Sequence, residues 1–133
     1  MRRYAEDTKV PVERSRAELE QLILKHGATQ ITLGADVEQG LALVQFRISD
    51  RYVHIRFTVP SKPQEARRKW RQMLLITKTK LELVADGGST IEREFLADVM
   101  LPNGTTVGEA LAPQLVSSYK NGKMPPLLGA GSE

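Results

Sequence analysis

Two runs of alternating apolar and polar residues, 41–48 and 52–59, most constrain the fold of this chain. Neighbouring side chains of a strand point to opposite sides of a sheet, so the apolar positions of each run share one face. Only Ser49, Asp50 and Arg51 separate the runs, a length that suits a hairpin. The pattern predicts two antiparallel strands, half-buried under these residues: Ala42, Val44, Phe46 and Ile48, then Val53, Ile55, Phe57 and Val59.

Helical spacing of apolar residues precedes and follows the hairpin. A first helix is expected over Val12 to His26, stopped by Gly27, and a short strand over Ala28 to Leu33. A long helix is expected from about Gln64 to Ala85, with Trp70 in its apolar stripe. Its apolar arc is wide, so later helices or another subunit should cover it, and a homo-oligomer is expected.

Two capping boxes predict two further helices. Ser89 with Glu92 opens a helix to about Met100, and Thr106 with Glu109 opens one to about Lys120. The predicted fold class is α+β, with a three-stranded antiparallel sheet backed by helices in the order α-β-β-β-α, followed by two shorter helices. One α+β domain is expected over 1–122, with a loosely ordered C-terminal tail over 123–133.

The composition of the chain limits the functions that it can have. The chain has no cysteine, which excludes disulfides, thiolate metal ligands and a cysteine nucleophile. No apolar run approaches the ~20 residues that span a bilayer, and the first seven residues do not read as a signal peptide. A cytoplasmic protein without membrane contact is expected.

Enzyme signatures are missing from the sequence. Of the two histidines, His26 falls at a helix end and His54 on the polar face of a strand. No metalloprotease, phosphate-loop, nucleophile-elbow or dinucleotide motif occurs. Pairs of carboxylates, Asp36 with Glu38 and Glu92 with Glu94, specify little. The expectation is a protein without catalytic residues, metal or cofactor.

Charge is unevenly distributed. The net charge is +3, yet residues 47–80 hold ten Lys and Arg against two acids, a net +8, which leaves −5 for the other 99 residues. A basic middle between acidic flanks favours a polyanionic partner. An uneven solvated surface is the alternative.

The long helix begins with basic residues, the wrong sign for the partial positive charge of a helix N-terminus. An anion would compensate, and a nucleic acid would suit several cations. At about 100° per residue, Trp70 faces the core and Lys69 lies apart from the other cations. The phosphate-binding candidates here are Lys62, Arg67, Arg68, Arg71 and Lys78.

A second set of candidates lies on the polar face of the hairpin, with Gln30 and Thr32 extending that face. Arginine interleaved with aromatic rings suits phosphates and stacked bases. A solvated sheet face explains the same residues equally well. The candidates of this face are Arg47, Tyr52, His54 and Arg56.

The order of elements over Val12 to Ala85 resembles the double-stranded RNA-binding domain, in which a basic cluster starts the second helix. Residues 61–69, SKPQEARRK, are similar to that cluster, although the Gly-Pro-x-His between the first strands is missing and the helix is longer. The same order resembles ring-forming single-strand annealing proteins of phages, which implies an oligomer with a basic groove.

Three segments resemble small proteins of phages and prophages: 8–20, TKVPVERSRAELE; 94–109, EFLADVMLPNGTTVGE; and 123–128, KMPPLL. This resemblance implies no site residues, and it favours DNA metabolism or inhibition of a host protein. The leading hypothesis is a non-catalytic, phage-type nucleic-acid-binding protein of recombination or replication, with DNA preferred to RNA. The alternatives are a module that binds an acidic host protein, and a structural or assembly protein of the virion.

Overall fold

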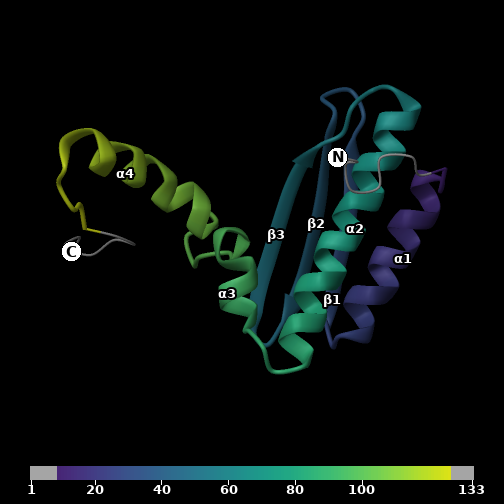
Figure 1. Cartoon of the computed structure of the whole chain (residues 1–133), viewed down its shortest axis with the longest axis horizontal. Coiled ribbons are helices and arrows are strands. Elements are labelled where there is room, and N and C mark those ends of the chain that lie inside the picture. The colour runs from purple at the N-terminus through teal and green to yellow at the C-terminus, as the bar shows by residue number, and fades with distance from the viewer. Residues whose placement is uncertain (1–8, 127–133) are drawn as a thin grey trace.

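A computed structural model describes residues 9–126 as a sheet with helices on one face and a helical arm reaching away from it (Figure 1). This confirms the α+β class and the expected order of elements. The elements are α1 (Val12–Lys25), β1 (Gln30–Asp36), β2 (Leu41–Ile48), β3 (Arg51–Thr58), α2 (Pro63–Ala85), α3 (Ile91–Phe95), the 3-10 helix η1 (Leu96–Asp98) and α4 (Val107–Asn121). No helix within the described ranges is long and apolar enough to cross a membrane. Residues 127–133 of the predicted tail lie outside the described part.

The sheet is antiparallel with the order β1-β2-β3. Ile48 pairs with Arg51, so the turn holds two residues and not the three expected from sequence. Ser49 and Asp50 both have positive φ, 50° and 60°, as a type I′ hairpin turn requires. Such turns favour Asn and Gly. This turn has neither residue, so the sequence predicted a turn that is one residue too long.

The apolar face of the sheet packs under α1 and α2, which lie side by side across it (Figure 1). The ring of Phe57 meets the sole tryptophan, Trp70, edge to face at 5.0 Å between centroids. Trp70 is only 2% exposed, which confirms its predicted place in the core. Leu19 and Ile23 of α1 complete the layer.

Phe95 of α3 extends the core beyond α2. Its ring packs edge-on against Phe46 at 5.8 Å between centroids, and both are nearly inaccessible to solvent. The predicted cap of this helix was wrong by one residue. The Thr90 hydroxyl, not that of Ser89, accepts the backbone N–H of Arg93, because Thr90 has the extended backbone that a cap needs. Ser89 instead donates to the Glu94 carboxylate.

The segment after η1 closes the outer edge of β3. Val99 forms a β-bridge with Val53, and the backbone N–H of Met100 donates to the carbonyl of Tyr52 at 2.8 Å. Thr106 and Glu109 then form the predicted capping box of α4. At the other end of α4, Gly122 has a positive φ of 71°, which stops the helix.

Asp98, at the end of η1, is partly buried beside Lys80 and His54. Burial raises the pKa of Asp98 above its ordinary value of 3.8, while the two neighbouring groups oppose that rise. Above pH 3.8 the folded state therefore holds this proton more tightly than the unfolded state. Stability falls as pH rises through the window between 3.8 and the raised pKa, and the loss persists at neutral pH.

Asp98→Asn is therefore expected to raise the free energy of unfolding at pH 7, with the gain fading below pH 3.8. Denaturant titrations at several pH values measure it. Glu38→Gln, in the exposed β1–β2 loop, serves as the control and should change little. An Asp98→Asn protein that is less stable at pH 7 would show that the attraction to Lys80 outweighs burial.

Candidate nucleic-acid interface

The sheet separates the two sets of candidate residues. On β3, Tyr52, His54 and Arg56 alternate with the buried Val53, Ile55 and Phe57, so they lie on the face away from the helices. Arg47 pairs with Tyr52 across β2 and β3 on that same face. The other set lies on α2, behind the sheet. The structure thus groups the sheet-face set, spreads the second set along α2, and does not join the two into one surface. The second set is Lys62, Arg67, Arg68, Arg71 and Lys78.

The polar groups of the open sheet face bond mainly to one another. The Tyr52 hydroxyl donates to Oε1 of Gln30 at 3.2 Å. Nδ1 of His54 lies 2.7 Å from Oε1 of Gln45, and Nε of Arg56 donates to Nε2 of His54 at 3.2 Å.

Carboxylates offset the arginines of this face. Arg47 lies over the Tyr52 ring and pairs with Asp50 at 3.2 Å. Near Arg56 lies the Glu109 carboxylate, whose pKa is lowered first by the backbone N–H and the hydroxyl of Thr106 and further by Arg56 and His54. The open face is therefore close to neutral, which disfavours phosphate binding there.

The first turns of α2 carry the predicted basic cluster. Pro63 occupies the first helical position, which it suits because it lacks an N–H. Lys62 precedes it, exposed and without a capping side-chain bond. Arg67 donates to Oε1 of Gln64 at 2.6 Å, and its Nε is buried with no hydrogen-bond partner in the described chain. Arg68 is half-buried.

Cations from α1 join Arg71 and Lys78 in a groove between the two helices. The groove has a volume of about 680 Å³. Glu18 is the one acid among the described residues that line it, and it pairs with Arg71 at 2.6 Å and with Arg14 at 3.6 Å. We call this the basic groove. Its lining residues are Arg14, Ala17, Glu18, Gln21, Leu22, Lys25, Arg71, Leu74, Leu75 and Lys78.

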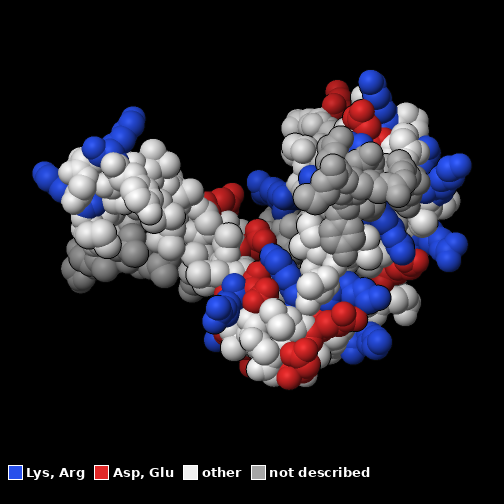
Figure 2. Space-filling view, viewed as in Figure 1, with Lys and Arg blue, Asp and Glu red and all other residues white. Residues whose placement is uncertain are grey.

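Sequence reasoning found two of the four cations of the basic groove and missed Arg14 and Lys25. The signal was present, because positions 14, 18, 21 and 25 recur at helical spacing and share one face of α1. Its meaning depended on α2 lying beside that face. In Figure 2, basic side chains gather on the right, over α1 and α2, with acidic ones among them.

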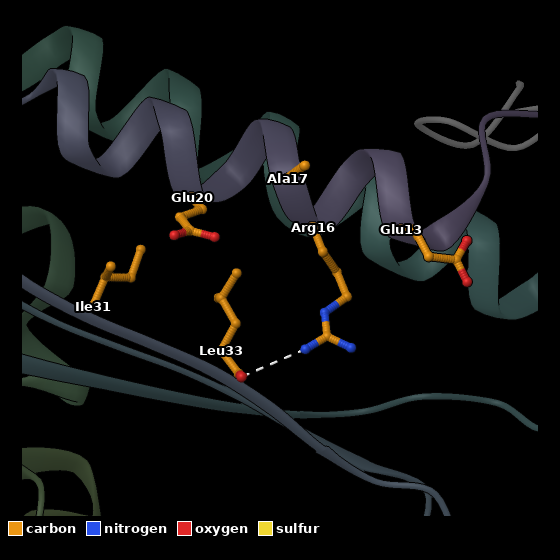
Figure 3. A pocket seen from close by; sticks show the side chains of 6 residues that line it. All are labelled: Glu13, Arg16, Ala17, Glu20, Ile31 and Leu33. Carbon is orange, nitrogen blue, oxygen red and sulfur yellow. Dashed lines mark hydrogen bonds between the residues drawn. The ribbon is translucent and has the colours of Figure 1, made fainter.

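A second hollow lies between α1 and β1 and has a volume of about 360 Å³ (Figure 3). Nη2 of Arg16 donates to the carbonyl of Leu33 at 3.4 Å, and its guanidinium carbon lies 5.1 Å from the Trp70 ring centroid. Glu13 and Glu20 lie at opposite ends of this hollow and do not converge. Arg16 therefore ties α1 to the β1 strand, and the hollow offers no paired acids for chemistry.

Metal-binding geometry is also missing from the described part of the chain, in which no three His, Asp or Glu residues come together as ligands. The best candidate site in the described part of the chain is thus the basic groove. Its lining combines four cations, one carboxylate and apolar side chains. Comparison of the chain with protein-family models, curated proteins and solved structures finds no match.

Proposed function

We propose that this protein binds the sugar-phosphate backbone of a nucleic acid, DNA in preference to RNA, along the basic groove. The observation that carries the proposal is the excess of charge there, four cations against the single carboxylate of Glu18. Cations that neutralise phosphates release condensed counterions, which drives binding without any contact to the bases.

The lining of the groove points to recognition without sequence preference. Leu22, Leu74 and Leu75 supply apolar surface between the cations, and no aromatic side chain is among the residues of 9–126 that line the groove. Phosphate and sugar contacts position a nucleic acid but carry no base information. The exposed ring of Tyr52 lies on the opposite face of the sheet and takes no part in this contact.

Fluorescence anisotropy with single- and double-stranded DNA and RNA of mixed sequence, each at two salt concentrations, tests the proposal. We expect binding at low salt that weakens steeply as salt rises, with little dependence on sequence. An affinity that does not change with salt, or no binding at low salt, would overturn the proposal. Such a result together with one acidic protein that co-purifies would favour the module that binds a host protein.

Glu18→Gln is expected to tighten DNA binding by roughly two- to fivefold, the scale of one interaction between surface charges. The change removes the groove's carboxylate and frees Arg71 and Arg14 from their pairs. Anisotropy titration in low salt measures the effect. Glu20→Gln makes the same change on the side of α1 that faces β1, and should leave affinity unchanged. Equal effects of the two variants would show that the groove is not the site.

A further inference from the structure

The arm formed by α4 presents its apolar side to solvent. Leu115 is 53% exposed, Val116 61% and Tyr119 90%. With Ala112 they recur at the three- and four-residue spacing of one helix face. Figure 1 shows α4 reaching away from the sheet, and Figure 2 shows few charges on the arm apart from basic ones near its tip. Helices of folded proteins normally bury such a face.

Local interactions alone give α4 little stability. Within the described residues, Val107 in the first turn is its one buried side chain, and its main packing is against η1. Pro113 lies inside the helix, where it removes one backbone hydrogen bond and destabilises the helix. Isolated helices of this length are marginal in water. A covering surface would supply the missing stabilisation.

We propose that the cover is a second copy of this chain, with the two α4 helices packed antiparallel about a two-fold axis. Glu109 in the first turn and Lys120 in the last are the charged residues of α4, and the ten residues between them are uncharged. Glu109 precedes Ala112 by three residues and Lys120 follows Val116 by four, so both flank the exposed apolar face on the same side of the helix.

Charge complementarity selects the antiparallel arrangement. Antiparallel packing sets Glu109 of each copy against Lys120 of the other at both ends of the apolar contact, whereas parallel packing sets like charges together. The helix dipoles also oppose each other favourably in the antiparallel pair. A two-fold contact closes on itself, so the assembly stops at a dimer.

Sedimentation velocity of the full chain over a range of concentrations tests the association. The wild type should form a species of twice 14.8 kDa. Val116→Asp puts a charge in the centre of the contact and should weaken the dimer at least about a hundredfold, because two like charges would meet there. Ser117→Asp adds the same charge on the next residue, about 100° around the helix, and should leave the dimer intact.

Single cysteines test the orientation, because the chain has none of its own. Leu115 lies midway between Glu109 and Lys120, so Leu115→Cys should form a disulfide with its own copy under mild oxidation. Tyr119 shares the face, but in the antiparallel pair its two copies are about 13 Å apart along the axis, too far for a disulfide. Tyr119→Cys should therefore stay reduced.

Three results would overturn the proposal. A wild type that is monomeric at every concentration would mean that a different molecule covers α4. A dimer that survives Val116→Asp would form through another surface. Disulfide formation by Tyr119→Cys as readily as by Leu115→Cys would show a parallel pair. Circular dichroism of each variant verifies that its fold is retained.

Discussion

Phe46→Ala is expected to lower the free energy of unfolding by about 3–5 kcal/mol, a large loss for a single substitution. Phe46 is 1% exposed in the central strand β2. Its ring also holds Phe95, so truncation leaves a cavity between the sheet and α3. Loss of that contact should loosen the segment that leads from α3 into α4.

Equilibrium unfolding in urea, followed by circular dichroism, measures the loss. Leu43→Ala is the matched control, because Leu43 lies on the same strand but on the open face and is partly exposed. Its loss should be well below that of Phe46→Ala. Comparable losses would contradict the assignment of the covered and open faces.

Lys25→Glu combined with Lys78→Glu is expected to weaken DNA binding roughly fiftyfold or more at about 0.1 M salt. Each phosphate contact contributes about 0.9 to the slope of log affinity against log salt, so two contacts account for nearly two decades between 0.1 M and 1 M. The reversed charges add repulsion. Both lysines line the basic groove from different helices.

The matched comparison is Arg47→Glu with Arg56→Glu, which makes the same change in net charge on the open sheet face. Because that face is close to neutral and its side chains bond to each other, this pair should lower affinity far less. A larger loss from the sheet-face pair would move the site to the other side of the sheet. Thermal unfolding of both double variants verifies that each remains folded.

The sheet and the core were predictable because they depend on local patterns. Alternation in 41–48 and 52–59 established which face is buried, and helical spacing placed Trp70 in the core. The turn was predicted one residue too long, because Ser49 and Asp50 adopt positive φ without the usual Asn or Gly. A local pattern does not reveal such strain.

The basic groove was only half predictable, because its charges come from segments far apart in sequence. Arg71 and Glu18 are 53 positions apart, and only the packing of α1 beside α2 shows that they pair. Of the expected cluster at the start of α2, only Arg71 lines the groove, where Glu18 pairs with it, whereas Arg67 and Arg68 lie outside the lining. Arg14 and Lys25 of α1 join Arg71 and Lys78 as cations of the site.

The arm formed by α4 shows a different limit of prediction from sequence. The capping box of Thr106 and Glu109 predicted where α4 begins. It does not tell whether the rest of the chain covers the apolar side of that helix. Solvent exposure of Val116 and Tyr119 is a property of the whole fold, and it is what indicates a further contact.

The central claim is that the basic groove carries the affinity for nucleic acid. Its most direct test is the slope of log affinity against log salt for DNA, measured for the wild type and for the Lys25→Glu, Lys78→Glu protein. We predict a steep slope for the wild type and one smaller by about 1.8 for the variant. Equal slopes for the two proteins, or a wild-type affinity that does not change with salt, would contradict the claim.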